Sequence, residues 1–229
     1  MVKDNRNCIA FKLNYCNGGA DDKRIGYLGV CSESVIDYNI KKAKRVWCKS
    51  DICDCKKYID GEMSYEELEN TEPCWESHLL IDWYASGGAD ERSRESRPIS
   101  KIDDLIGSLC LLTTVKPNDN EENRIVFAMF IIGRTYIDEY GANFVIADKK
   151  YRLEFKPNET YKSKYWEIKK LNKDGSKRWG SGLFRYFDNE EAIKFIKKAV
   201  EIKKGTSEEN FAKEFLNHYC KINNIKNFD

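Results

Sequence analysis

The 229-residue chain lacks several features that would assign it to a class at once. It has no apolar run of the roughly 18 residues that a membrane-spanning helix needs, so no membrane partner is expected. Only four prolines argue against a linker-rich chain. The first residues lead into no apolar segment, so no export signal is readable. We therefore expect a cytoplasmic protein.

Motifs of several enzyme classes are also missing. No Gly-x-Ser-x-Gly, P-loop or Gly-x-Gly-x-x-Gly stands in a convincing context, and two histidines leave little for histidine-dependent chemistry. One enzymatic alternative stays open. Glu154-x-Lys156, with Asp138 or Asp148 as metal partner, would form half of a metal-dependent nuclease site. Acid-x-Lys pairs arise often by chance in so charged a chain, so a binding module is favoured over an enzyme.

The net charge of +1 hides a strong asymmetry along the chain. Residues 150–229 hold 19 Lys+Arg against 12 Asp+Glu, whereas residues 1–149 hold 20 against 26. A basic half joined to an acidic half suggests a polyanionic partner, DNA or RNA, for one face. The alternative is that the C-terminal lysines are simply solvated.

Nine cysteines are many for a chain without a readable export signal, and disulfides are not expected in a reducing compartment. Five of them fall between residues 31 and 74, and these are Cys31, Cys48, Cys53, Cys55 and Cys74. The stretch 47–57, which holds Cys48, Cys53 and Cys55, is polar and carries lysines, a poor setting for buried cysteines. The pattern predicts a metal site, with buried free thiols as the alternative.

The five thiols compete for the four places of a tetrahedral ion. Zinc is the expected metal, and an iron–sulfur cluster stays open because it takes the same ligands. His78, one helical turn after Cys74, is a further candidate ligand or an ordinary surface histidine. Cys110 and Cys220 are interpreted as core residues, while Cys8 and Cys16 are left unassigned.

The pattern of apolar residues predicts an α+β fold. The expected strands and helices, by residue number, are strands at 9–16, 109–115, 124–133, 143–147, 151–155 and 165–168, and helices at 34–43, 73–84, 189–203 and 207–222. Strands 109–115 and 124–133 should form a hairpin. Asp188 or Asn189 should cap the helix at 189–203. We expect a small mixed β-barrel with flanking helices (residues 99–229) and an N-terminal cysteine-rich module (residues 1–98).

Cations and aromatic rings interleave over residues 149–185, which hold 12 Lys+Arg against four Asp+Glu. Cations attract phosphates and flat rings stack on bases, so this stretch is the expected nucleic-acid surface. The candidate binding residues are Trp166, Arg178, Trp179, Ser181, Arg185 and Tyr186. Gly180 and Gly182 flank Ser181 and would let a phosphate or a flipped base approach the backbone. The alternative is a strand end with a glycine bend.

The run 101–114 (KIDDLIGSLCLLTT), followed after a loop by 124–130 (RIVFAMF), resembles the core of PUA-like barrels of the EVE and ASCH type. The strand at 151–155 falls where such barrels place another strand. The resemblance covers about residues 100–190 and implies recognition of nucleic acid, often of a modified base held in an aromatic pocket. Some relatives serve in modification-dependent restriction systems. The cysteine-rich first third departs from that family.

Three functions follow from these patterns. The first is a binding module that reads DNA or RNA by phosphate attraction and ring stacking, with a cysteine–metal knuckle. The second is a metal-dependent nuclease or nucleic-acid-processing enzyme. The third is an iron–sulfur or redox protein in which the cysteines themselves are the function.

Overall fold

The computed structural model describes residues 8–18, 26–72, 74–87, 98–180 and 182–226. They fall into two compact units. Unit 1 combines Met1–Lys12, Tyr84–Thr114 and Asn120–Asp229, and unit 2 combines Leu13–Trp83 with Val115–Asp119. Unit 2 is therefore an insertion in the chain of unit 1. This division differs from the expected boundary at residue 98, because the segments before residue 13 and after residue 83 supply strands to the sheet of unit 1.

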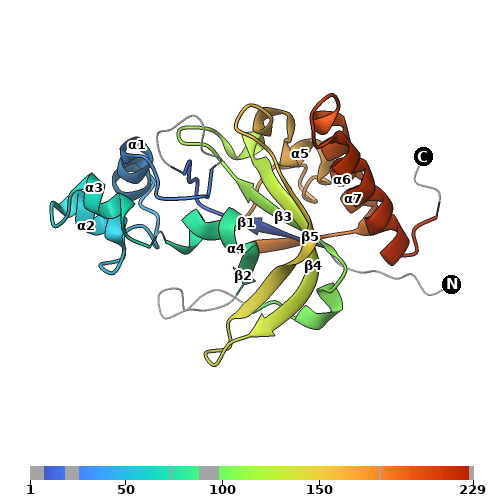
Figure 1. Cartoon of the computed structure of the whole chain (residues 1–229), viewed down its shortest axis with the longest axis horizontal. Coiled ribbons are helices and arrows are strands. Elements are labelled where there is room, and N and C mark those ends of the chain that lie inside the picture. The colour runs from blue at the N-terminus through green and yellow to red at the C-terminus, as the bar shows by residue number, and fades with distance from the viewer. Residues whose placement is uncertain (1–7, 19–25, 73, 88–97, 181, 227–229) are drawn as a thin grey trace. The chain divides into compact units, whose positions relative to one another are not determined.

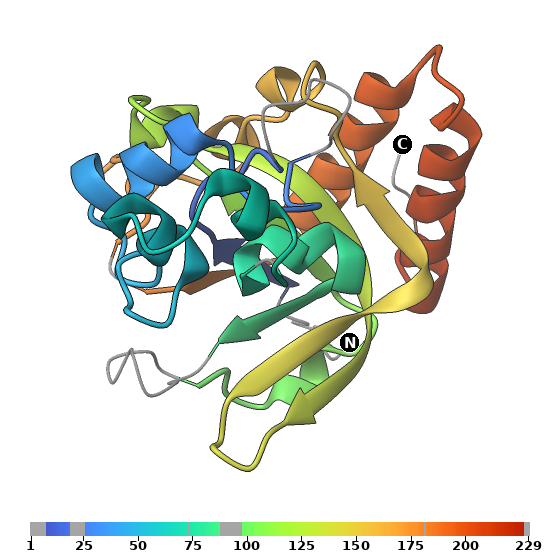
Figure 2. The ribbon, with the colours of Figure 1, turned by 60° about the vertical axis from the view of Figure 1, so that its left-hand side comes forward.

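Unit 1 is a mixed α+β structure around one six-stranded sheet. Its strands are β1 (Cys8–Lys12), β2 (Tyr84–Gly87), β3 (Leu109–Thr114), β4 (Ile125–Ile137), β5 (Asn143–Glu154) and β6 (Phe184–Phe187), in the spatial order β2-β5-β4-β3-β1-β6. Its helices are the short α5 (Tyr165–Ile168), α6 (Asn189–Lys203) and α7 (Glu209–Ile222), with 3₁₀ turns at Ile102–Leu105, Glu121–Asn123 and Thr160–Lys162. The sheet is a curled half-barrel whose edges are β2 and β6, and Figure 2 shows the strong twist of β4 and β5.

The sheet is antiparallel except that β1, next to the edge strand β6, runs parallel to β3. β3 is buried at every position, as is β4 from Ile125 to Ile132, because these strands are covered on both faces. One face packs against α6 and α7 (Figure 1), and Phe195, Phe215 and Tyr219 of these helices join the core. The predicted hairpin of β3 and β4 is confirmed.

Helix α6 begins as its sequence predicts. The Asp188 side chain accepts a hydrogen bond from the backbone N–H of Glu191, and the Glu191 side chain accepts one from the N–H of Asp188. This capping box satisfies donors that the first helical turn leaves unpaired. Glu191 is buried and also accepts hydrogen bonds from the Lys169 ammonium at 2.9 and 3.1 Å. Through Glu191, this ion pair connects the start of α6 to the segment that follows α5.

Four segments differ from the expected pattern. Residues 143–154 form one continuous strand, although a break near residue 148 was expected. Tyr165–Ile168 is a helical turn, not a strand, because pairing ends at the isolated bridge between Ile125 and Lys164. The edge strands β2 and β6 were not predicted. Each has only four residues, too few for a clear alternation of buried and exposed positions.

Unit 2 is built from short helices joined by turns. They are α1 (Glu33–Asp37), a π-helical turn (Tyr38–Lys42), α2 (Asp54–Asp60), α3 (Tyr65–Glu69), a 3₁₀ turn (Trp75–His78) and α4 (Leu79–Asp82). A capping box of Ser64 and Glu67 is present at the start of α3. None of the helices is long enough to bury a large apolar face, so their arrangement depends on the side chains between them.

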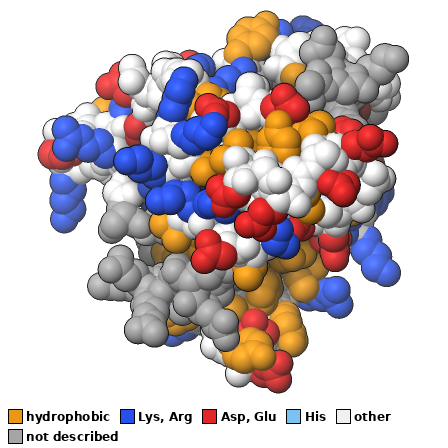
Figure 3. All heavy atoms as spheres, turned by 90° about the vertical axis from the view of Figure 1, so that its left-hand side faces the viewer, with side chains coloured by type: hydrophobic (Ala, Val, Ile, Leu, Met, Phe, Trp, Pro, Cys, Tyr) orange, Lys and Arg blue, Asp and Glu red, His pale blue; other side chains and the backbone are white. Residues whose placement is uncertain are grey.

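Charge is segregated within unit 2. Residues 41–57 hold seven Lys+Arg against two Asp+Glu, while residues 58–76 hold seven Asp+Glu and no Lys or Arg. Lys and Arg side chains gather in a band on the face of the molecule that Figure 3 shows. No helix within the described part of the chain is long and apolar enough to cross a lipid bilayer.

Candidate metal centre

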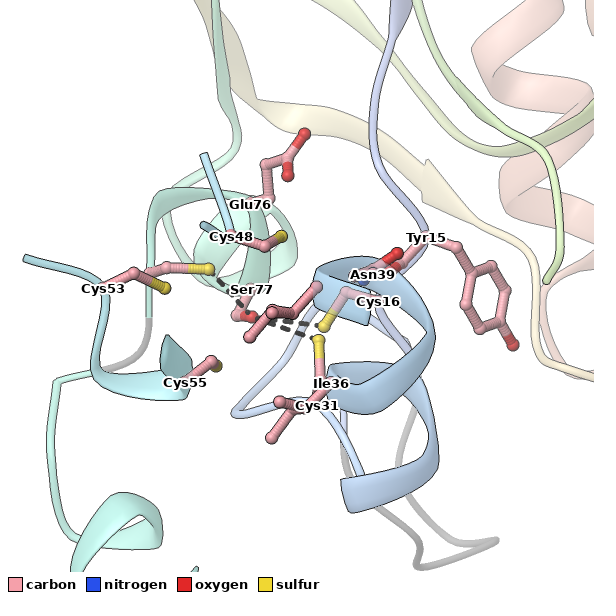
Figure 4. A pocket seen from close by; sticks show the side chains of 12 residues that line it. Tyr15, Cys16, Cys31, Ile36, Asn39, Cys48, Cys53, Cys55, Glu76 and Ser77 are labelled. Atoms are coloured by element: carbon pink, nitrogen blue, oxygen red, sulfur yellow. Dashed lines mark hydrogen bonds between the residues drawn. The ribbon is translucent and has the colours of Figure 1, made fainter. Parts of the chain in front are cut away.

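Six of the nine cysteines line one cavity in unit 2 (Figure 4), and they are Cys16, Cys31, Cys48, Cys53, Cys55 and Cys74. The remaining lining residues include Glu76 and Ser77. The cavity volume is about 20 Å³, room for one water-sized occupant. The structure thus brings together all five cysteines that the sequence analysis singled out, and adds Cys16.

Four of the six thiols lie in a turn or just before a short helix, whereas Cys55 lies within α2. Cys31 precedes α1, Cys48 lies in a turn, Cys53 is the residue before α2, and Cys74 is the residue before the 3₁₀ turn. Turns allow side chains from distant parts of the sequence to point inward without a long apolar run. The six cysteine sulfurs of unit 2 therefore lie around one cavity.

The Ser77 hydroxyl lies among three of these thiols. Its Oγ is 3.2 Å from the Sγ of Cys16, 3.4 Å from that of Cys74 and 4.0 Å from that of Cys31. Ser77 is almost fully buried, at 1% exposure. Oγ has one proton to donate and can accept from the other thiols, so the hydroxyl links the three sulfurs into one polar network.

The remaining three thiols interact with one another. A hydrogen bond from Cys55 lowers the pKa of Cys53 to about 6, against the effect of burial. The same contact, together with burial and the charge of Cys53, raises the pKa of Cys55. Burial raises the pKa of Cys48, and the charges of Glu76, Cys74 and Cys53 add to the effect. Cys53 is therefore the sulfur of this group that ionises first.

The three thiols around Ser77 show the same pattern, in which one pKa is lowered and the other two are raised. Burial raises the pKa of Cys16, but hydrogen bonds from Cys31 and Ser77 outweigh burial and lower it. The pKa of Cys31 is raised by the hydrogen bond to Cys16, by burial and by neighbouring thiolate charges. Burial raises that of Cys74 to about 12. In each set of three thiols, the negative charge of the first thiolate raises the pKa of its neighbours. A cation among the sulfurs would offset this repulsion between thiolates.

Glu76 forms part of the cavity wall and is held in place by Asn14. Its two carboxylate oxygens accept hydrogen bonds from the Asn14 backbone N–H at 2.8 Å and from the Asn14 Nδ2 at 2.7 Å. Burial raises the pKa of Glu76, and the Asn14 hydrogen bonds and Arg45 charge offset part of the rise. The carboxylate adds negative charge beside Cys48 and Cys74.

The side chains as placed do not form a closed coordination shell. Within the described residues, no three Cys, His, Asp or Glu side chains converge closely enough to hold an ion. All nine cysteines are free thiols. His78 does not line the cavity; its Nδ1 lies 3.4 Å from the Asp82 carboxylate. A metal would bind here only if the sulfurs moved closer together.

The two tryptophans expected to stack on bases are buried in unit 1. Trp166 and Trp179 are 4% and 3% exposed, and both belong to the core beneath α6. The Trp166 Nε1 donates to Glu121 at 3.2 Å, and the Trp179 Nε1 donates to the Gly182 carbonyl at 2.8 Å. Burial removes the two largest flat surfaces of the expected interface from contact with a base.

The other expected nucleic-acid residues are distributed differently. The Arg185 guanidinium lies 5.5 Å from the Trp166 ring centre and donates to the Asn172 side chain at 3.0 Å. Tyr186 is half-buried, Arg178 is exposed, and Ser181 lies outside the described residues. The assignment of these residues to a nucleic-acid surface stays a prediction.

The two aspartates of the nuclease alternative hydrogen-bond to nearby backbone N–H groups. Asp138 accepts hydrogen bonds from the backbone N–H groups of Tyr140 and Ala142, and Asp148 accepts from those of Lys150 and Tyr151. Burial raises the pKa of Glu154, which makes it a poorer metal ligand. None of these residues belongs to a metal-binding group among the described side chains.

Two residues of the candidate centre were not found from the sequence. Cys16 was left unassigned because it ends a segment that reads as a strand, although β1 already ends at Lys12. Ser77 gives no signal of its own. The spacing of Cys74 and Ser77 is the one hint, because residues three apart on a helical turn share a face. Comparison with known proteins found no matching family model, no matching curated protein and no matching solved structure.

Proposed function

We propose that the chain is a metal-binding protein whose unit 2 holds zinc through cysteine thiolates. The observation that carries this proposal is the convergence of six of nine cysteines on one ion-sized cavity. Cysteines serving only as small core residues would spread over the interior, as Cys8, Cys110 and Cys220 do in unit 1. Zinc thiolate sites also give short helices and turns the cohesion that a small apolar core does not supply.

The size of the cavity favours a metal ion over the alternatives. About 20 Å³ accommodates one ion, whereas an iron–sulfur cluster brings several iron and sulfide atoms. A dithiol redox centre needs two sulfurs at bonding distance, and no cysteine pair stands at that distance here. Zinc is the common tetrahedral partner of thiolates and needs no electron transfer.

Elemental analysis of the full chain tests the proposal. The protein is purified under reducing conditions without chelator, and metal content and thermal unfolding are measured before and after treatment with a chelator. We expect bound zinc, and a chelator-induced fall in the unfolding temperature of unit 2. Cys53→Ala should reduce the zinc content, while the matched control Cys220→Ala, on α7 in unit 1, should leave it unchanged. A protein free of metal and indifferent to chelator overturns the proposal.

Binding of nucleic acid is the second candidate function, and exposed basic side chains favour it. Eight lysines and arginines between residues 149 and 178 are exposed, and they are Lys149, Lys150, Lys156, Lys162, Lys170, Lys173, Lys177 and Arg178. With Trp166 and Trp179 buried, the affinity would come from phosphates more than from stacked bases. The PUA-like resemblance belongs to this candidate as its structural rationale.

Salt dependence separates this candidate from the first. Oligonucleotide binding should weaken steeply between low and moderate salt, and Lys173→Glu with Lys177→Glu should weaken it further. A matched control is Lys213→Glu, an exposed lysine on α7. Cleavage of the oligonucleotide in Mg²⁺ that Glu154→Ala abolishes would instead support the nuclease alternative. Absence of salt-sensitive binding eliminates nucleic acid as a partner of this surface.

A further inference from the structure

The outer ends of β4 and β5, together with β2, extend the sheet of unit 1 beyond its helix-covered core. The core beneath α6 and α7 reaches Ile131 on β4 and Tyr151 on β5, and among the described residues it includes none of β2. Past these points the strands continue to Ile137, Asn143 and Gly87. Figure 1 shows this end of β4 and β5 directed away from the two helices.

One face of this extension is buried and the other is open. Along β5, Asn143, Val145 and Ala147 are buried, while Phe144 and Ile146 between them are only partly buried. The pairing of β5 with β2 and β4 continues the open face across three strands in two rows. One row is Tyr84, Ile146 and Arg134, and the other is Ser86, Phe144 and Tyr136.

Three aromatic rings, one from each strand, meet on the open face. The centre of the Phe144 ring lies 5.8 Å from that of Tyr84 and 5.9 Å from that of Tyr136. Tyr136 is 56% exposed, and Tyr140 at the hairpin tip is 77% exposed. Exposed apolar side chains that gather in one place mark binding surfaces, and rings on an open sheet offer stacking positions for unpaired bases.

The cations of this face lie at one end of it. The backbones of Gly133 and Asp148 pass so closely that a Cβ at Gly133 would lie 2.8 Å from the Asp148 Cα. Arg134 and Lys149 are the next residues along their strands, and both are exposed. The hairpin tip at the other end, residues 138–142, carries two acids and no cation. Phosphates are therefore attracted to the end that holds Arg134 and Lys149.

We propose that the open face of β2, β5 and β4 binds single-stranded nucleic acid. Unpaired bases stack on the rings of Tyr136 and Phe144, and the phosphates lie toward Arg134 and Lys149. A duplex does not bind in this way, because its bases already stack on one another and their faces are not available to the rings. The inference rests on the second candidate function, and it names the form of the nucleic acid and a set of rings outside residues 149–185.

Binding of a short labelled oligothymidylate to the full chain tests the inference, with its duplex with oligoadenylate for comparison. The single strand should bind more tightly than the duplex. Tyr136→Ala should weaken single-strand binding about tenfold, whereas Tyr136→Phe, which keeps the ring, should not. The matched control is Tyr161→Ala, because Tyr161 is 57% exposed but lies outside this face. Arg134→Gln should reduce the slope of the salt dependence.

A measurement on the unaltered chain covers the case in which a variant does not fold. A photoreactive oligonucleotide that carries bromouridine should crosslink to a peptide containing Tyr136 or Phe144. Crosslinks confined to residues 149–185, equal binding of single strand and duplex, or an equal loss in Tyr161→Ala overturns the stacking face and leaves the second candidate function intact. A dimer that Tyr136→Ala separates shows that a second copy covers the face and also overturns the inference. Absence of all oligonucleotide binding overturns both.

Discussion

Lys203 carries a charge in the interior of unit 1, and its replacement is the sharpest test of the energetics there. Its side chain has no exposed surface, and its Nζ lies 2.7 Å from Glu159 Oε2 and 2.7 Å from Glu208 Oε2. The Glu159 side chain is only 10% exposed, whereas that of Glu208 is 32% exposed. In Lys203→Met the chain length is nearly kept, but Glu159 loses its counter-charge while still buried.

The magnitude follows from the burial of the partner left behind. Removal of one member of a buried ion pair typically costs about 3–5 kcal/mol, because the remaining charge is desolvated without compensation. Glu159 keeps one other hydrogen bond, from the Lys156 backbone N–H at 2.8 Å, so the lower part of that range is expected. Glu208 turns to solvent and adds little.

Calorimetric unfolding of the full chain measures the effect on unit 1. Lys203→Met should lower the stability of unit 1 by about 3 kcal/mol. Lys203→Met combined with Glu159→Gln should recover most of the loss, because no uncompensated charge remains in the buried position of Glu159. The control is Lys213→Met, which removes an exposed ion pair with Glu209 one helical turn away and should change nothing measurable. Equal effects of the two single substitutions would refute the reasoning.

Three further outcomes are expected. Asp188→Ala should destabilise the α6 start by about 1 kcal/mol. Burial raises the Asp188 pKa, but the Glu191 N–H and Lys170 outweigh burial and lower it below 3.8. The stabilisation from Asp188 is therefore full above pH 3.8 and is lost in acid titrations as the pH falls further. Gly133→Ala should cost about 1–3 kcal/mol in urea unfolding, since its Cβ would lie 2.8 Å from the Asp148 Cα; Gly182→Ala is the mild control. The Cys8 thiol, whose pKa burial raises to about 11, should resist alkylation in the folded chain at pH 8 and react once it unfolds.

Local signals made parts of the fold predictable. The β3–β4 hairpin and the start of α6 depend on residues close in sequence, namely a turn between two apolar runs and the Asp188–Glu191 capping box. The α+β class followed from the same patterns. The position of β1 between β3 and β6 was not predictable, because these partners are about a hundred or more residues away and five residues carry no register signal.

The candidate centre divides in the same way. Five of its cysteines stood out because they fall close together in the sequence, three of them in the polar, lysine-bearing stretch 47–57. Cys16 and Ser77 join through tertiary contacts that sequence spacing does not encode. Trp166 and Trp179 were expected on a binding surface but are buried. Aromatic residues among cations occur in a core as readily as on a binding surface.

The place of β1 in the sheet has a consequence for synthesis of the protein. This strand leaves the ribosome before the other five strands of the sheet, yet it pairs on one side with β3 and on the other with β6, which ends at Phe187. Until the last strand emerges, β1 has an unsatisfied edge, and unit 2 is complete long before unit 1 can close. Nascent chains should therefore acquire a protease-resistant segment around residues 13–83 well before the sheet becomes resistant.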